Sequence, residues 1–291
     1  MIFRKFLAIF LLCAWGQFAG ATHFFPPQTY LPEENAQMFE NNCGLYKLAY
    51  DSGEFLKYKV YYNWTAFWVP AGIATFQVKN NNLENKNLLH IVSEGRSLSS
   101  YDWFFKVYDV YESYLDPTNH QPFRFVRNVD ENGFTIQQQY TFNAAKNNVK
   151  IDHEYKLGEL KRSNETIAVE PCIQDMVSAL YYARCIDFDS YDKGALIPMQ
   201  VFVDGEPYDI SIKYLGKDQI KTDFGKFNCI KISPQLIVGD IFKEEEGMVI
   251  WATDDDNKVP LYVESPLRVG KIKAYLIDYK GLKYDLAALK K

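Results

Sequence analysis

Hydrophobic and polar residues alternate along most of this chain, and a period of two predicts half-buried β-strands. The runs 122–130 and 134–143 flank Asp-Glu-Asn-Gly, and the runs 196–204 and 207–214 flank Asp-Gly-Glu. Such turn sequences between alternating runs favour hairpins. About fifteen short strands follow one another in this way, at spacings typical of antiparallel all-β proteins. Strands and helices do not alternate, which argues against a parallel sheet.

One stretch, residues 170–188, follows a helical period instead. Its apolar residues Ile173, Met176, Val177, Leu180 and Tyr181 fall at i, i+3, i+4, i+7 and i+8, along one stripe of a helix. Pro171 suits a first helical turn because its fixed φ is compatible with a helix and its missing N–H is not needed there. The pattern therefore predicts an amphipathic helix over residues 171–186.

The predicted helix divides two series of strands, residues 44–170 and 195–286. A sheet with this many strands must curl or close to protect its edges. We therefore expect an all-β fold, a large antiparallel meander curled into a barrel or half-barrel, with the helix packed in or on it. Two β lobes are the alternative, and we prefer a single domain over residues 45–291.

The first 21 residues read as a secretory signal peptide. Arg4 and Lys5 precede an apolar run over residues 6–15, and Ala19-Gly20-Ala21 follows it. That run is shorter than the roughly 20 residues a spanning helix needs, and no later segment is long enough. Residues 22–44, rich in Pro and Asn, predict an extended N-terminal segment. We expect an exported protein of the periplasm or outer envelope, without a transmembrane span.

The net charge of the chain argues against nucleic acid as a partner. Removing Arg4 and Lys5 leaves 30 of the 32 Lys and Arg against 37 Asp and Glu, a formal charge of −7. The basic footprint of a nucleic-acid-binding protein is therefore absent. With 47% hydrophobic and 16% aromatic residues, the chain can bury a large core.

Four cysteines follow the signal peptide, namely Cys43, Cys172, Cys185 and Cys229. Cys172 and Cys185 bracket the predicted helix, and thirteen residues at 1.5 Å each would hold them roughly 20 Å apart. They cannot then bond to each other. A disulfide must run from the helix to Cys43 or Cys229, or all four thiols are free. No Cys or His pair has the spacing of metal ligands, so no metal and no cofactor is expected.

Several blocks resemble one family of exported bacterial proteins, the domain of unknown function 3108. The blocks are AGIATFQV, SLSSYDWFFKVYDVYESYLD with the following QPFRF, QDMVSALYYAR, and VIWATDDDNKVPLYVESPLRVGKIKAYL. They occur in the family's order over roughly residues 53–276. The resemblance implies an exported, strand-rich fold of Gram-negative envelopes and no established activity. The segment before Gly44 lies outside it.

Arg184 is the most unusual residue of the helix. At 100° per residue it lies only about 20° from Ile173, within the apolar stripe. Its guanidinium can reach out of that stripe and cap carbonyls at the helix C-terminus, which is our first interpretation. Alternatively it is buried, paired with a carboxylate such as Asp109 or Asp255 or holding an anionic ligand.

Two further groups are candidate sites. Residues 254–256 are three aspartates in a predicted hairpin turn, more typical of turn chemistry than of a calcium site. Two aromatic clusters near predicted turns belong to the core, our first interpretation, or form an exposed patch at the barrel mouth that binds lipid or glycan. These clusters comprise Trp64, Phe67, Trp68, Trp103, Phe104 and Phe105.

These observations favour a non-enzymatic envelope protein that binds a lipid or another amphipathic molecule. The candidate ligand-binding residues are Arg184, Tyr181, Asp175, Trp64, Trp68, Trp103, Asp109 and Asp255. A structural or assembly partner of another envelope protein is an alternative. A hydrolase using Asp109, Asp175 and Asp255 is another, and it requires two of these carboxylates to converge in one cleft. No catalytic residue is assigned.

Overall fold

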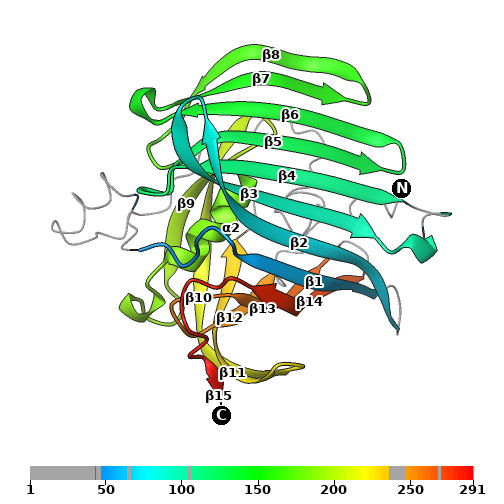
Figure 1. Ribbon diagram of the computed structural model, residues 1–291, viewed down its shortest axis with the longest axis vertical. Helices are drawn as coiled ribbons and strands as arrows, with labels where there is room; N and C mark the ends of the chain where they lie inside the picture. The colour runs from blue at the N-terminus through cyan, green and yellow to red at the C-terminus, as the bar shows by residue number, and fades with distance from the viewer. Residues whose placement is uncertain are drawn as a thin grey trace.

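The computed structural model describes residues 43, 47–63, 67–101, 103, 106–235, 247–267 and 270–290. The predicted signal peptide and most of the extended N-terminal segment lie outside these residues. Fifteen strands of the described chain form one antiparallel sheet (Figure 1). They are β1 (Phe55–Asn63), β2 (Trp68–Leu83), β3 (Lys86–Ser97), β4 (Val107–Leu115), β5 (Pro122–Glu131), β6 (Phe134–Asn143), β7 (Asn148–Lys156), β8 (Glu159–Ala168), β9 (Leu196–Val203), β10 (Glu206–Thr222), β11 (Gly225–Gln235), β12 (Val249–Thr253), β13 (Pro260–Pro266), β14 (Lys271–Lys280) and β15 (Leu289–Lys290).

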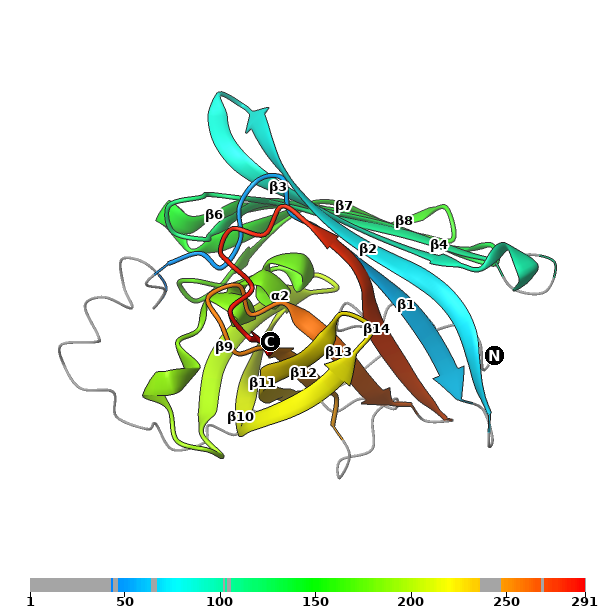
Figure 2. The same ribbon diagram turned by 60° about the horizontal axis from the view of Figure 1, so that its bottom comes forward.

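The sheet curls without closing. Its strand order is β8-β7-β6-β5-β4-β3-β2-β1-β14-β13-β12-β11-β10-β9, with β15 paired to β11, so β8 and β9 remain as edges. Strands β4–β8 form one wall and β9–β13 the other, while β1, β2 and β14 curve between them (Figure 2). The expected curled antiparallel meander is confirmed in its half-barrel form. All strands share one sheet, while the domain limits stay a prediction.

Side chains alternate between the two faces of each strand, and the apolar ones point into the half-barrel. In β1, Leu56, Tyr58, Val60 and Tyr62 are buried, and the residues between them are half-buried. The helix α2 (Met176–Cys185) lies inside the half-barrel and packs against β3, β4 and β9. An apolar stripe on a helix removes hydrocarbon surface from water only against another apolar face, and the inner sheet face provides it. Among the described residues no helix is long and apolar enough to cross a bilayer.

The helix starts later than its pattern predicts. Its first turn begins at Met176 and not at Pro171, and Asp175 is the N-cap. The Asp175 carboxylate accepts hydrogen bonds from the N–H groups of Val177 and Ser178, both at 2.8 Å. The Ser178 hydroxyl accepts in turn from the Asp175 N–H at 2.7 Å, which completes a capping box. Gln174 pairs instead with Val201 of β9 as an isolated bridge. Backbone pairing with the sheet therefore holds the residues just before the cap out of the helix.

Short elements lie near several of the turns. A 3₁₀ turn, η2 (Ser99–Tyr101), precedes β4. Further 3₁₀ turns are η3 (Ala144–Lys146) and η4 (Phe188–Ser190). Between β5 and β6, Asn132 and Gly133 both have positive φ, 53° and 84°. Two successive positive φ angles define the hairpin turn that Asn-Gly favours.

A disulfide joins Cys43 to Cys172, with the Cα atoms 5.3 Å apart, whereas Cys185 and Cys229 are buried thiols. Of the alternatives open from sequence, the bond from the helix region to Cys43 is therefore present. The Tyr182 hydroxyl also donates to the Cys43 carbonyl oxygen at 2.7 Å. Both contacts fasten the segment before β1 against α2.

Removing this disulfide should destabilise the protein without changing the fold. The bond closes a long loop, since 129 positions separate its cysteines, and loss of such a native bond costs about 2–5 kcal/mol. We expect Cys43→Ser/Cys172→Ser to lower the free energy of unfolding by that amount in urea titrations. Reductant should lower the wild-type midpoint and leave the double variant unchanged. A reduced wild type that unfolds at the oxidised midpoint would contradict this prediction.

Candidate functional site

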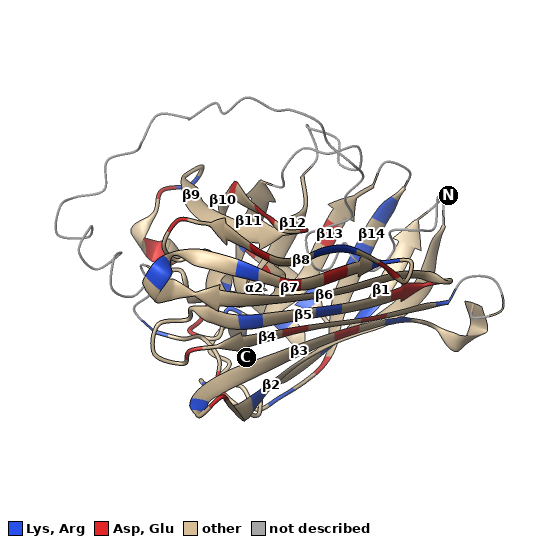
Figure 3. Ribbon diagram, turned by 90° about the horizontal axis from the view of Figure 1, so that it is seen from above, with Lys and Arg blue, Asp and Glu red and all other residues tan. Residues whose placement is uncertain are grey.

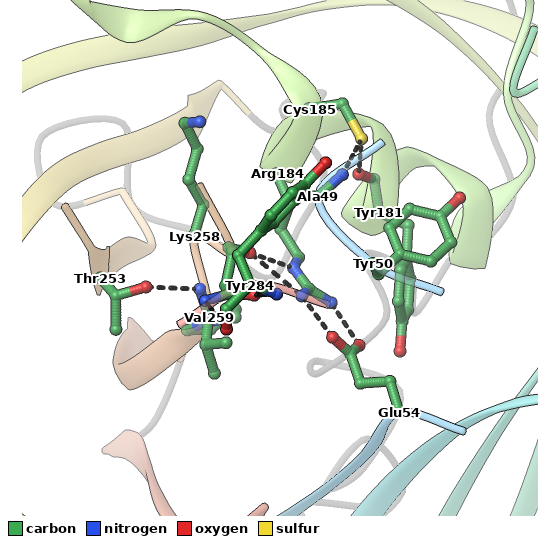
Figure 4. Close-up of polar contacts among 12 residues, drawn as sticks. Ala49, Tyr50, Glu54, Tyr181, Arg184, Cys185, Thr253, Lys258, Val259 and Tyr284 are labelled. Atoms are coloured by element: carbon green, nitrogen blue, oxygen red, sulfur yellow. Dashed lines mark hydrogen bonds and ion pairs between the residues drawn. The ribbon is translucent and has the colours of Figure 1, made fainter. Parts of the chain in front are cut away.

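The centre of the half-barrel is organised by a buried ion pair between Arg184 and Glu54 (Figure 4). The two guanidinium Nη atoms donate to the two carboxylate oxygens at 2.6 and 2.7 Å, a bidentate geometry. Arg184 is 5% exposed and Glu54 is fully buried. Arg184 also donates from Nε and Nη2 to the carbonyl oxygen of Asn257, both at 3.1 Å. The pair therefore ties α2 to the start of β1 and to the β12–β13 turn.

This position corrects two sequence predictions. The guanidinium of Arg184 points inward and does not reach solvent or cap the helix, so our first interpretation is wrong. The buried pair of the alternative exists, but its partner is Glu54 and not Asp109 or Asp255. No short-range pattern could identify that partner, because 130 residues separate Glu54 from Arg184 in the sequence.

Aromatic rings enclose the pair. The Arg184 guanidinium carbon lies 4.9 Å from the ring centre of Tyr181 and 5.6 Å from that of Tyr50. Burial alone would lower the pKa of Arg184, but the adjacent Glu54 carboxylate raises it above its ordinary value. Burial, with the charge of Glu54, raises the pKa of Tyr181. The cluster is electrically neutral, with a charged arginine and a protonated tyrosine.

An apolar cavity lies between α2 and the inner face of the β9–β13 wall. The space open to the centre of a water-sized sphere is about 80 Å³, whereas about 10–15 Å³ of that measure accommodates one water molecule. Leu180 and Ala183 line it from the helix, and Tyr58 and Phe76 line it from β1 and β2. The other wall presents alternate residues of its strands, including Met199, Ile210, Ile212, Ile230, Ile232, Pro234, Ile250 and Val263.

Two charged side chains reach this cavity. Arg184 is neutralised by Glu54, while Lys258, in the β12–β13 turn, is half-buried at its edge. Tyr181 also lines the cavity, so Arg184 and Tyr181 are the two sequence-predicted candidates that the fold brings together here. Lys258 was not among the predicted candidates. An isolated lysine in a polar turn carries no pattern that indicates a neighbouring cavity.

Asp175 and Asp255 have structural roles. Asp175 caps α2 and also accepts a hydrogen bond from the Ser113 hydroxyl of β4. Burial raises the pKa of Asp175 to about 6, although these hydrogen bonds oppose the shift. Asp255 accepts hydrogen bonds from the Thr253 hydroxyl at 2.7 Å and from the Ala288 N–H at 3.1 Å. It therefore holds the β12–β13 turn against the C-terminal segment.

The other acids of that turn form ion pairs. Asp256 pairs with Lys47 at 2.9 Å, and Asp254 pairs with Lys217 at 3.1 Å. Within the described ranges, no group of three or more His, Cys, Asp or Glu is arranged to hold a metal ion. The three aspartates thus act as turn and surface residues.

Asp109 lies on the inner face of β4 and is fully buried. Neither carboxylate oxygen has a hydrogen-bond partner of good geometry in the described chain. Burial raises the pKa of Asp109 to about 7, while Arg127 and the nearby Asp130 N–H favour its charged form. Burial therefore favours the protonated form of this carboxyl group.

A polar network that links this wall to the β9–β10 turn was not predicted from the sequence. Arg127 donates to Asp204 at 2.8 Å and to Gln138 at 3.2 Å, and Gln138 donates to Glu154 at 3.4 Å. The Tyr140 hydroxyl donates to Glu154. The available signal was the presence of polar residues at inward-facing positions, such as Arg127 between Phe125 and Val129.

Within the described chain, the three carboxylates of the hydrolase hypothesis do not meet in the apolar cavity. Asp109, Asp175 and Asp255 share no hydrogen-bond partner, and none of the three lines the apolar cavity. Two carboxylates flanking one substrate bond would need to face a common space.

The aromatic residues that the structure describes near the turns are exposed. Phe67 is 77%, Trp68 37% and Trp103 84% exposed, so assigning them to the core was wrong. They do not line the cavity, and Trp68 lies beside Lys273, whose Nζ is 4.3 Å from its ring centre. Trp64, Phe104 and Phe105 fall outside the described residues.

The sequence matches the family model described as "Protein of unknown function (DUF3108)" over residues 57–277. The chain belongs to the DUF3108 family. This confirms the resemblance that the strand and helix blocks indicate. The DUF3108 chain has no match among curated proteins.

Among solved structures, the DUF3108 fold is similar to a beta-barrel-like protein of domain of unknown function DUF1849 from Brucella abortus. The TM-score is 0.53 at 8% sequence identity, over 80% of this chain and 98% of the other. At that identity the likeness concerns the fold alone. It agrees with a barrel-like curled sheet.

Replacing Arg184 in this DUF3108 protein should be strongly destabilising. Arg184→Met leaves Glu54 charged and buried, and breaking a buried pair from one side costs about 3–5 kcal/mol. Adding Glu54→Leu should recover part of that loss, because it removes the unpaired charge. Chemical denaturation measures both. Lys161→Met, which breaks the exposed Lys161–Glu159 pair, is the control and should leave the midpoint almost unchanged. If Arg184→Met unfolds at the wild-type midpoint, the pair is not structural.

The buried Asp109 predicts a pH dependence of stability. Its folded-state pKa is raised from 3.8 to about 7, so the folded state favours the protonated carboxyl group. The stability that depends on this protonated form is lost as the pH rises from about 4 to about 7. We expect the wild type to lose stability relative to Asp109→Asn between pH 4 and pH 7. Melting temperatures over that range measure it. As a control, the melting temperature of the exposed-site variant Asp209→Asn should change with pH as that of the wild type does. If the melting temperature of Asp109→Asn also follows the wild type over this range, the prediction is refuted.

Proposed function

We propose that this protein binds an apolar or amphipathic molecule of the cell envelope in the cavity beneath α2. The supporting observation is the lining, which is almost entirely aliphatic and aromatic and comes from both α2 and the facing sheet. Pockets that bind small molecules are typically concave, mostly apolar and supplied with few polar groups. Neutralisation of Arg184 by Glu54 leaves a space suited to hydrocarbon.

The cavity also has a thermodynamic rationale as a binding site. Residues that line an empty space lose dispersion contacts that a packed core would make. Dry apolar cavities in proteins take up small hydrocarbons for this reason. An alkyl chain beneath α2 would restore these contacts.

We further propose that the protein works after export, in the periplasm or outer envelope. The leader-like first 21 residues support this location, and so does the Cys43–Cys172 disulfide. Disulfides persist in oxidising compartments and are rare in the cytosol. Figure 3 shows basic and acidic residues interspersed along strands β3–β8, without a basic stripe suited to nucleic acid.

A structural or assembly role is a second candidate. Phe67, Trp68 and Val69 follow the β1–β2 turn, and Trp103 lies between β3 and β4. Because β1 and β3 run in the same direction, both connections lie at the same end of the sheet. Exposed aromatic residues are enriched at protein interfaces. If this role is correct, a crosslinker placed at this end of the sheet should capture a protein partner in cells.

Binding in the cavity predicts a co-purifying ligand. Native mass spectrometry of gently purified protein should show added mass, which organic extraction removes and identifies. Ala183→Phe fills the cavity from the helix and should abolish the added mass. Ala145→Phe, at an exposed site of η3, should retain it.

The same variants can be tested with the neutral amphiphile decanol. A ligand at about 100 times its dissociation constant adds about 2.7 kcal/mol to the stability of the folded state. The wild type and Ala145→Phe should therefore melt several degrees higher with decanol, and Ala183→Phe should not. Absence of both bound mass and a decanol effect in the wild type would sink the proposal.

A further inference from the structure

We infer that the ligand of this cavity is an anionic amphiphile, whose acidic head group binds Lys258 and whose alkyl chain lies beneath α2. The inference rests on the proposed function and names its ligand class. It depends on the position of Lys258, on the charges around it and on the direction of the cavity.

Lys258 is held at the cavity edge by a well-bonded turn. The preceding Asn257 donates from its side chain to the carbonyl oxygens of Tyr284 and Asp285 at 3.0 and 3.2 Å, and it accepts from the Tyr284 N–H at 2.9 Å. The Asp255 carboxylate accepts from the Lys258 N–H at 3.3 Å. The backbone of Lys258 is thus fixed, while its side chain is half-buried along the apolar lining.

Lys258 is the cation at this cavity whose charge is not neutralised. Its side chain forms no ion pair within the described part of the chain, whereas Arg184 is paired with Glu54. In Figure 4 the amine of Lys258 points away from that pair. The neighbouring acids Asp254 and Asp256 are already paired with Lys217 and Lys47. The Asp255 carboxylate also lies near Lys258, but the Thr253 hydroxyl and the Ala288 N–H hold it in the turn. The Lys258 amine therefore favours an anionic head group and disfavours a cationic one.

The alkyl chain has a defined direction. The Thr253 N–H donates to the Val259 carbonyl oxygen at 2.9 Å, which places Lys258 at the Ala252 end of β12. Ala252 pairs with Ile230 of the neighbouring strand β11. From Ile230 the cavity lining continues along β11 through Ile232 to Pro234. The four steps from Ile230 to Pro234, at about 3.3 Å each, give a track of roughly 13 Å. That length suits a medium-length alkyl chain with its head group at Lys258.

The test compares decanoate with decanol, which share a chain length and differ in charge. Isothermal titration should show that the wild type binds decanoate more tightly than decanol. Lys258→Met keeps the length and apolar stem of the side chain without its charge. It should weaken decanoate binding about tenfold or more, since it removes a charge-assisted contact to the carboxylate. It should leave decanol binding unchanged.

Two further variants act as controls. Lys258→Arg should retain decanoate binding, and Lys146→Met, at an exposed lysine of η3, should bind both compounds like the wild type. Equal binding of decanoate by the wild type and Lys258→Met would overturn the inference and leave the proposed function standing. Equal wild-type affinities for decanoate and decanol would do the same. If the wild type binds neither compound, the proposed function fails as well.

Discussion

The buried pair of Arg184 and Glu54 is the constraint on which the centre of this structure depends. A charge taken out of water is costly unless it is paired and hydrogen-bonded. The bidentate contact and the Asn257 carbonyl oxygen meet that requirement only when α2, the start of β1 and the β12–β13 turn come together. These elements are far apart in sequence, so the pair specifies how the helix sits inside the curled sheet. Because Glu54 neutralises Arg184, the guanidinium adds no net charge to the adjoining cavity.

The two walls of the half-barrel differ in chemistry. The β9–β13 wall presents aliphatic residues to the helix and forms most of the cavity. The β4–β8 wall carries a buried polar network around Arg127 and, on β4, the poorly solvated Asp109. Hydrocarbon is therefore best accommodated on one side of the interior. Asp109 is a buried acid on the other side, and Lys258 lies at the edge of the apolar space.

Much of the fold follows from local pattern. The alternation in β1 and the Asn132-Gly133 turn predict strands and a hairpin because side-chain period and turn geometry depend on adjacent residues. The helix start was misplaced because Pro171 is compatible with a helix, whereas the Gln174–Val201 bridge, which competes with it, is a contact with a distant strand. Trp68 and Trp103 were assigned to the core because an apolar residue beside a turn carries no local sign of its exposure.

The sequence by itself determined the antiparallel strand-rich class, an amphipathic helix within residues 171–186, the family and the presence of a cation in the apolar stripe of that helix, since each depends on neighbouring residues. Only the tertiary structure decided that Glu54 is the partner of Arg184, that Cys43 bonds to Cys172, and that Lys258 borders an apolar cavity. These contacts join segments separated by tens to more than a hundred residues. Their formation depends on how the whole sheet curls, and no local periodicity encodes that curvature.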